Sequence, residues 1–289
     1  MSEGGSPPPA VVAEEPPPEI LFRRRLHLIT AAKELWAARE LIGTLTERNL
    51  RSRYKQTFLG FAWSLITPVT LMVVFTVFLQ RVADIETGDI PYSIFSYVGL
   101  LPWAFFSNAV TQSSSVILSN NSLLNKVYCP REVFPISTIT TSAIDTVFAM
   151  VALIVLFLVH RIVPSTASMW VPVLTLVLLC FTLGVSLLVS ALTVYARDLR
   201  HGVGIIMQLG LFATPVAYSL SSLVPKGWQP VYAAANPLGP VIQGYRDTVL
   251  SGQSPELGLL AIAAASSLVW AFAGYVVFKK LEDGFSDVA

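Results

Sequence analysis

Long runs of sequence without a formal charge constrain the fold of this chain most. Five runs of at least 22 residues lie between charged neighbours, and a sixth apolar stretch is interrupted by Asp145 alone. About 20 apolar residues in a helix cross the hydrocarbon core of a bilayer. The sequence therefore predicts an all-α integral membrane protein with six transmembrane helices, which fall within residues 56–80, 90–125, 133–160, 162–196, 201–225 and 257–278.

The composition of the chain favours the same class. Of the 289 residues, 54% are hydrophobic and 13% are charged, whereas soluble domains are about 25% charged. The net charge of +1 gives no support to nucleic acid as a partner. The two cysteines, Cys129 and Cys180, are too few for a disulfide framework, and no cysteine or histidine pair has the spacing of metal ligands. We expect no metal site and no bound cofactor in this chain.

Two segments precede the first predicted span. Residues 1–22 are rich in proline, glycine and glutamate, and we expect them to form a disordered tail. Residues 23–56 are predicted to form an amphipathic interface helix region, one or two helices long, because apolar side chains recur there at helical spacing: Leu35, Ala38, Ile42, Leu45 and Asn49. The stripe is too short to span a bilayer, so it lies in the interface, with basic residues toward lipid phosphates, or packs on a partner. The alternative is a solvated basic helix that only anchors the first span.

Basic residues are distributed unevenly on the two sides of the predicted spans. With the amino terminus inside, 15 lysines and arginines lie on the inner side and 4 on the outer side, and cytoplasmic flanks are enriched in such residues. Most of this bias comes from the first flank. The sequence thus predicts a plasma-membrane protein with both termini in the cytoplasm, a transmembrane domain over residues 57–281 and a cytoplasmic tail over 282–289.

The sequence carries no motif for catalysis. No G-x-x-x-x-G-K-[ST] phosphate loop occurs, so this chain cannot hydrolyse ATP alone. Asp145 is the acid inside a predicted span, where carboxylates often relay protons. We favour the interpretation that Asp145 lies at a helix interface, where it is hydrogen-bonded to nearby hydroxyl groups, those of Thr140, Thr141, Ser142 and Thr146.

Five blocks of the sequence, in order, resemble the permease subunits of type-2 ABC transporters that export polysaccharides such as O-antigens, teichoic acids and capsules. The resemblance covers residues from about 35 to 282 and is nearest, by general likeness, to the actinobacterial galactan exporters. The blocks are YKQTFLGFAW from Tyr54 with Pro68 beyond, GLLPW from Gly99 with FFS from Phe105, NNSLLNKVYCPREVFP from Asn120, YARDLRH from Tyr195, and TPVAY from Thr214 with Asn236-Pro237 and Gly244-Tyr245-Arg246.

The resemblance implies a complex and a cargo. Two copies of this permease are expected to assemble with two copies of a separate nucleotide-binding ATPase, which holds ATP and magnesium. The implied cargo is a polyprenyl-diphosphate-linked polysaccharide, of a galactan or O-antigen type. One six-helix bundle encloses little room for a sugar chain, so the channel is expected between two bundles. The first and fifth spans are candidates for opening it, and Pro215 in the fifth can kink the helix.

Two cytoplasmic loops are candidates for coupling to the ATPase. The loop from Asn120 to Pro135 contains the charged residues Lys126, Arg131 and Glu132. Pro130 and Pro135 are expected to mark the two ends of a short helix in it. The resemblance adds Arg197 and Asp198 in the second inner loop. An ordinary positive-inside loop is the alternative. Just before the first span, Leu59 and Gly60 are predicted to form a tight bend, because glycine adopts backbone conformations that other residues avoid. A plain continuous helix is the alternative there.

Aromatic side chains are candidates for the channel lining, because their faces stack on sugar rings without fixing a register. The candidates are Trp63, Tyr97, Trp103, Phe105, Phe106 and Tyr218. Aromatic residues are also enriched in interfacial belts and on lipid-facing surfaces, which is the alternative for each of them.

The segment from Ser221 to Ser254 is longer than the other outer loops. Its apolar stretches 231–235 and 238–250 are too short to cross a bilayer, and we expect two short re-entrant helices that line the channel mouth. The resemblance assigns the outer gate to this region, with Asn236, Pro237, Tyr245 and Arg246. A folded cap on the outer surface is the alternative.

Two other functions compete with polysaccharide export. An ABC permease of the same type with a drug or a lipid as cargo keeps the whole architecture. A membrane-embedded glycosyltransferase requires a metal-binding acidic motif, and the close acidic pair outside the tails is Asp84 and Glu86, in a short loop.

Overall fold

The computed structural model describes residues 28–55, 60–80, 90–120, 123, 129–163, 165–282 and 284–285. The predicted tail 1–22, the acidic pair Asp84 and Glu86, and part of the tail 282–289 lie outside these residues. The helices are α1 (Leu28–Ala37), α2 (Arg39–Tyr54), α3 (Ala62–Phe75), the π-helical extension η2 (Thr76–Gln80), α4 (Tyr92–Ser119), α6 (Val133–His160), η3 (Thr166–Trp170), α7 (Val171–Tyr195), α8 (Leu199–Ala213), α9 (Leu220–Leu223), η4 (Lys226–Trp228), α10 (Gln229–Ala235), α11 (Leu238–Val249) and α12 (Leu257–Glu282).

Five helical stretches are long and apolar enough to cross a membrane. They are Ala62–Leu79, Tyr92–Ser119, Val133–His160, Thr166–Tyr195 and Leu257–Glu282. The fifth span expected from the sequence, within 201–225, corresponds to α8, which has 15 residues and ends at Ala213. Non-helical backbone follows, because Pro215 has no N–H to continue the helix. The chain is an all-helical, multi-pass membrane protein with five to six long apolar helices.

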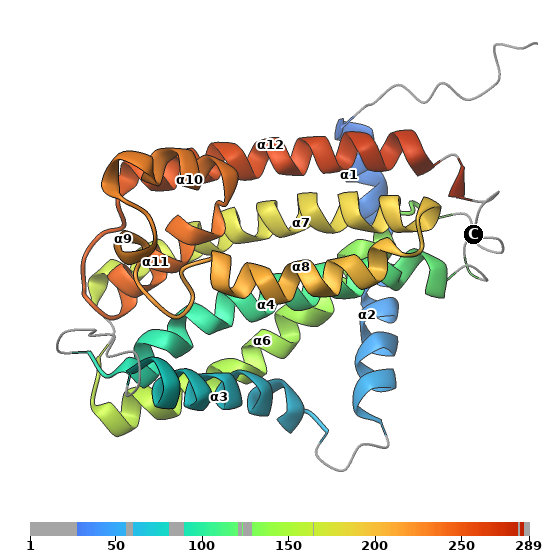
Figure 1. Cartoon of the computed structure of the whole chain (residues 1–289). Coiled ribbons are helices and arrows are strands. Elements are labelled where there is room, and N and C mark those ends of the chain that lie inside the picture. Colours follow the sequence, from blue (N-terminus) through green and yellow to red (C-terminus); the bar gives the residue numbers. More distant parts are fainter. Residues whose placement is uncertain are drawn as a thin grey trace, which may run out of the picture.

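The long helices run side by side, and the shorter ones gather at the two ends of the bundle (Figure 1). At one end, here called the α2 end, α2 lies across the other helices. At the opposite end, here called the α11 end, α9, α10 and α11 form a group between α8 and α12 (Figure 1). The apolar stretches 231–235 and 238–250 thus form two short helices with nearly the predicted bounds.

Helix α4 forms the centre of the bundle. It packs against α3, α6, α7, α8 and α11, and it is the most buried of the five membrane-length helices. Its aromatic side chains join the core, where the ring of Phe106 stacks on Phe181 of α7 at 5.1 Å between centroids. In helices α3 and α6, by contrast, most apolar side chains are partly or fully exposed.

Helices α7 and α12 approach each other closely at two glycines. A Cβ atom on Gly274 would lie 2.1 Å from the backbone oxygen of Gly184, and one on Gly184 would lie 2.3 Å from the backbone oxygen of Trp270. Small residues at such crossings let helix backbones touch, which is a common source of helix association in membranes.

We expect the substitution Gly274→Ala to destabilise the protein, because the added methyl group overlaps the backbone of α7. The expected loss is about 1–3 kcal/mol in the free energy of unfolding, as for other overpacked cores. Gly258→Ala in the same helix is the control, since no atom lies within 4 Å of a Cβ there. Thermal unfolding of the purified protein in detergent measures both, and equal unfolding temperatures would show that the two helices do not touch at Gly274.

Candidate functional site

Helix α2 docks on the bundle through one face. Leu45 and Thr46 are buried, and the predicted stripe of Leu35, Ala38 and Ile42 packs with Leu45 against a hydrophobic cluster that includes Phe134 of α6. On the opposite face the hydrophilic residues Glu47, Arg51 and Lys55 are exposed, and Arg51 pairs with Glu47. The amphipathic pattern is therefore used for packing on this chain's own spans.

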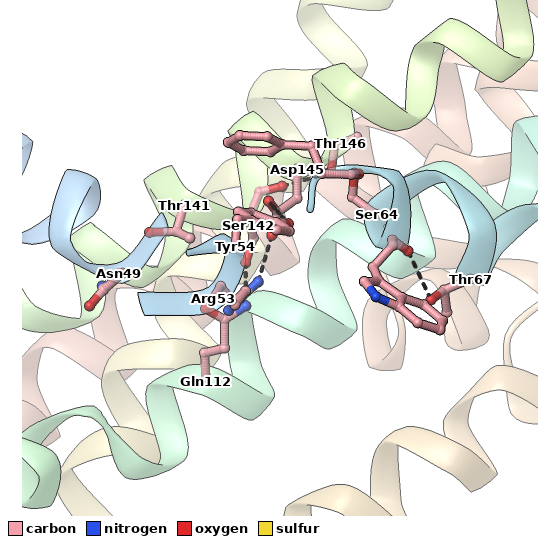
Figure 2. Close-up of polar contacts among 12 residues, drawn as sticks. Asn49, Arg53, Tyr54, Ser64, Thr67, Gln112, Thr141, Ser142, Asp145 and Thr146 are labelled. Atoms are coloured by element: carbon pink, nitrogen blue, oxygen red, sulfur yellow. Dashed lines mark hydrogen bonds and ion pairs between the residues drawn. The ribbon is translucent and has the colours of Figure 1, made fainter. Parts of the chain in front are cut away.

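Asp145 of α6 is bound by the last turn of α2. Arg53 Nη1 donates to Asp145 Oδ2 at 2.6 Å, and Tyr54 Oη donates to Oδ1 at 2.6 Å (Figure 2). The prediction of hydroxyl partners within α6 was wrong in detail: Thr140, Thr141 and Thr146 donate to the carbonyl groups one turn earlier, and Ser142 accepts from Gln112. Asp145 is a helix-interface residue, and its partners come from another helix.

The chain bends between α2 and α3. Gly60 has φ +50°, in the left-handed region that glycine tolerates, and Leu59 lies outside the described residues. The ring of Phe61, which follows, lies 4.1 Å from that of Tyr54 and 4.6 Å from that of Phe148. These contacts link the end of α2, the start of α3 and the middle of α6.

The loop before α6 is tied to the end of α12. Glu132, one of the candidates for coupling to the ATPase, is buried and pairs with Lys279, which also binds Glu282 at 2.8 Å. Arg131 donates to the carbonyl oxygen of Glu282 and lies over the ring of Phe285 at 5.6 Å. Pro130 begins the turn that leads into α6, and Lys126 lies outside the described part of the chain.

The Cys129 thiol and the charged pair Arg197 and Asp198 also lie at the α2 end. Burial raises the pKa of the Cys129 thiol, and the nearby Arg131 opposes this rise. The thiol therefore stays protonated, which makes it a poor nucleophile. Arg197 and Asp198 are exposed in the turn between α7 and α8. In the described ranges, no group of three or more His, Cys, Asp and Glu side chains is placed to hold a metal ion.

The candidate channel aromatics fall into two groups. Four of them lie on α4 and are buried in the hydrophobic core of the bundle: Tyr97, Trp103, Phe105 and Phe106. Within a single chain they pack against other helices and face no open channel. Trp63 on α3 is 52% exposed, and Tyr218 is half-buried and donates to the carbonyl oxygen of Phe212. Sequence alone missed this division because α4 is apolar on nearly all sides in its first half.

The non-helical segment after α8 is held by side chains from other helices. Arg246 of α11 donates to the carbonyl oxygens of Pro215 at 2.9 Å, Tyr218 at 2.8 Å and Val216. Two tyrosines bind further carbonyl oxygens here, since Tyr232 Oη donates to Ala213 at the end of α8 and Tyr92 Oη donates to Ala217, at 2.8 and 2.7 Å. Unpaired backbone groups are costly inside a membrane, and this set of contacts pairs them.

Arg246 is fully buried and depends on Gly99 for its space. Its Nε also donates to the carbonyl oxygen of Phe95 at 3.1 Å, and its guanidinium carbon lies 3.8 Å from the centre of the Phe95 ring. A Cβ atom on Gly99 would lie 2.4 Å from Arg246 Nη2. Arg246, which the resemblance assigns to the outer gate, is thus a buried residue that organises the backbone.

The other residues assigned to the outer gate have separate partners. Asn236 Nδ2 donates to Thr214 Oγ1 at 2.9 Å, and its Oδ1 accepts from the N–H of Leu238 at 3.2 Å. Pro237 caps the start of α11. Tyr245 Oη shares a hydrogen bond of 2.7 Å with Thr175 Oγ1 of α7. Asn236 and Arg246 therefore act on the same non-helical segment, from both ends.

Comparison with known proteins gives a consistent result. Residues 40–250 match the family model described as ABC-2 type transporter. The chain is 31% identical over 260 residues to the O-antigen export system permease protein RfbA of Myxococcus xanthus, covering 90% of this chain and 99% of that protein. It is 26% identical over 252 residues to the protein of that name from Klebsiella pneumoniae, with 86% and 95% covered. It is 24% identical over 241 residues to the polysialic acid transport protein KpsM of Escherichia coli, with 82% and 91% covered.

The ion pair between α2 and α6 leads to a prediction. We expect Asp145→Ala to reduce the free energy of unfolding by about 1–3 kcal/mol, since the guanidinium of Arg53 then loses its hydrogen-bond acceptor at the interface between α2 and α6. The exchange Arg53→Asp with Asp145→Arg is expected to restore part of the loss. The control is Glu47→Ala, which breaks an exposed pair worth about 0.3–0.5 kcal/mol. A double-mutant cycle on the unfolding temperature measures the pair, and additive effects would show that the two side chains do not interact.

A second prediction concerns the Arg246 contacts. Arg246→Met removes the donors of four carbonyl groups, and each buried orphan costs about 1–3 kcal/mol. We expect severe loss of folded protein, judged by size-exclusion chromatography. Gly99→Ala should also destabilise the protein, since a Cβ there would lie 2.7 Å from the backbone oxygen of Val216, but less than Arg246→Met, because the guanidinium and its hydrogen bonds are kept. Gly204→Ala in α8, where a Cβ meets no atom within 4 Å, is the matched control, and a Gly99→Ala protein as stable as this control would contradict the close packing.

Proposed function

Since the chain belongs to the ABC-2 type transporter family, we propose that it is the channel-forming subunit of an exporter of lipid-linked polysaccharide. It is a permease and not an enzyme, so the hydrolysis of ATP falls to a separate ATPase partner. The observation that carries the cargo assignment is the likeness over 99% of an O-antigen export permease. A second relative named for polysialic acid transport supports a glycan cargo.

The finer identity of cargo and assembly belongs to the same proposal. The cargo is a polyprenyl-diphosphate-linked glycan of galactan or O-antigen type, carried from the cytoplasm across the plasma membrane. Two copies of the chain face each other and two ATPase subunits bind them from the cytoplasm. Support for the dimer comes from the single protomer, whose core is filled by the side chains of α4 and leaves the channel to be formed between copies.

The α2 end of the bundle faces the cytoplasm in this proposal. The basic residues of α2 and both termini of the described chain lie there (Figure 1). The turn at Arg197 and Asp198 and the segment from Pro130 to Glu132 then face the ATPase, and Lys126 of the same loop stays a candidate for coupling. Because Arg131 and Glu132 bind the end of α12, a push on this loop would move α6 and α12 together.

The α11 end becomes the outer gate. Helices α10 and α11 are too short to span a bilayer, and α11 packs against α4, α7 and α12, so we propose that both dip into the outer half of the membrane. The non-helical segment after α8 lies against them through Asn236 and Arg246. A tilt of α8 about this segment would open the channel, with the exposed Trp63 and the half-buried Tyr218 as the aromatic residues near the passage.

Silencing the gene in its own host tests the function. We expect lipid-linked polysaccharide to accumulate inside the cell while its synthesis continues, because export and not assembly is blocked. Complementation with the intact chain restores surface polysaccharide, and complementation together with an ATPase that cannot hydrolyse ATP does not. Normal surface polysaccharide combined with loss of a drug-efflux or lipid-transport phenotype would overturn the assignment in favour of another ABC-2 cargo.

A further inference from the structure

One side of α4 changes character halfway along the helix. From Tyr92 to Trp103, every residue except Ser93 is buried. From Ala104 onward, residues at every third or fourth position are partly or fully exposed, and most are polar and uncharged: Ala104, Ser107, Asn108, Thr111, Gln112, Ser115, Leu118 and Ser119. This polar face of α4 belongs to the half of the helix nearer the α2 end.

Hydrogen bonding within the protomer leaves much of this face unused. Gln112 Nε2 donates to Ser142 of α6 at 3.0 Å, and Ser115 donates to the carbonyl oxygen of Gln112 at 3.3 Å. The side chains of Asn108 and Thr111 are exposed and have no hydrogen-bond partner within the described part of the chain. Amide and hydroxyl groups without partners are disfavoured in hydrocarbon. This face must therefore meet water or another polar molecule.

The neighbouring helices leave the polar face of α4 uncovered. Gly210 of α8 contacts Trp103 on one side, where a Cβ would lie 2.8 Å from the indole ring, and Gln112 contacts α6 on the other side. Helices α3 and α8 both pack on α4, and among the described residues they have at most a marginal contact with each other. In the view of Figure 2, Gln112 lies below Arg53, and its partner Ser142 lies on α6.

We propose that the polar face of α4, centred on Asn108 and Thr111, binds the hydroxyl groups of the exported glycan as the glycan enters from the α2 end. This inference rests on the proposed function. Helix α4 has no formally charged residue, so the face suits the neutral sugar part of the cargo and not its diphosphate. Uncharged amides and hydroxyls exchange hydrogen bonds readily with water and sugar, so they hold the polymer without fixing its position.

The face also accounts for a difference from the aromatic lining expected from the sequence. The aromatic side chains of α4 point into the protomer, and the polar side chains of its second half point out. On this helix the passage is therefore lined by hydrogen-bonding groups, and stacking on aromatic rings is left to exposed residues such as Trp63 on α3.

Cysteine accessibility in the assembled transporter tests the inference. In a background with Cys129→Ser and Cys180→Ser, single cysteines replace Asn108 and Thr111. The controls are Ala109→Cys, which is fully buried on the same helix, and Ile154→Cys, which is 58% exposed on the apolar face of α6. A charged, water-soluble methanethiosulfonate reagent is applied to inside-out vesicles. We expect Asn108→Cys and Thr111→Cys to react at least about 10-fold faster than both controls, since a thiolate forms readily only where water reaches the sulfur.

The lipid-linked glycan itself then separates the two proposals. The glycan is added without ATP. We expect it to slow the labelling of Asn108→Cys and Thr111→Cys. The labelling of Lys55→Cys, on the exposed face of α2, should not change. Labelling as slow as at Ile154→Cys would overturn the inference and leave polysaccharide export untouched. Fast labelling without protection by glycan would overturn glycan binding at this face. Failure of the vesicles to export any polysaccharide, despite fast labelling, would overturn the proposed function instead.

A pair of substitutions adds a readout of transport. Asn108→Leu with Thr111→Val removes the hydrogen-bonding groups and keeps the number of side-chain non-hydrogen atoms, and we expect the export rate to fall several-fold while the protein level persists. The control is Val151→Leu on the exposed face of α6. Export at the level of this control would contradict a role of the face in glycan binding.

Discussion

The bundle depends on pairing the backbone of the non-helical segment that follows α8. Helix α8 ends at Ala213 because Pro215 lacks an N–H, and the exposed carbonyl groups would be costly at membrane depth. The pairing is done by side chains of distant segments, with Arg246 from α11, Tyr92 from α4 and Tyr232 from α10. A guanidinium suits this task because its rigid fork presents five donors. Its charge has no carboxylate partner among the described residues within ion-pair distance, and the carbonyl dipoles and the ring of Phe95 serve in place of one.

This pairing joins the α11 end to the centre of the molecule. Arg246 touches both the non-helical segment and Phe95 of α4, and Gly99 supplies the space in which it lies. One turn further along, Trp103 packs against Gly210 of α8. At the other end, Arg48 of α2 donates to Asn120 at the end of α4, and Gln112 binds Ser142 of α6. Helix α4 is thus in contact with the elements proposed to move at each end, and in that proposal it would carry a change from one end to the other.

The elements that depend on local pattern were predictable, and those that depend on distant partners were not. The long uncharged runs gave the helices, and prolines with short apolar stretches gave α10 and α11. The amphipathic stripe of α2 was recognised, and Gly60 lies at the bend with a positive φ. The partner of Asp145 was missed because Arg53 is 92 residues away in the sequence. The orientation of Trp103 and Phe106 was missed because a helix with apolar residues on all sides gives no periodic signal for its buried face. Arg246 was assigned to the outer gate by resemblance, and a sequence does not show which carbonyl groups its guanidinium would bind.

The relation between burial and polarity in this chain is the reverse of that in a soluble protein. Among the five membrane-length helices, α4 has the lowest mean hydropathy and is the most buried, while α6 is among the most apolar and the least buried. Lipid is the solvent for α6, so apolar side chains face outward, and the polar residues of α4 and of the first half of α6 turn toward each other, as in the contact between Ser113 and Thr138. The polar residues that remain exposed on α4 break this rule, because a helix at the centre of the bundle should turn them inward as well. Their exposure in the single chain is the observation that supports a hydrated passage, in place of lipid, beside this face.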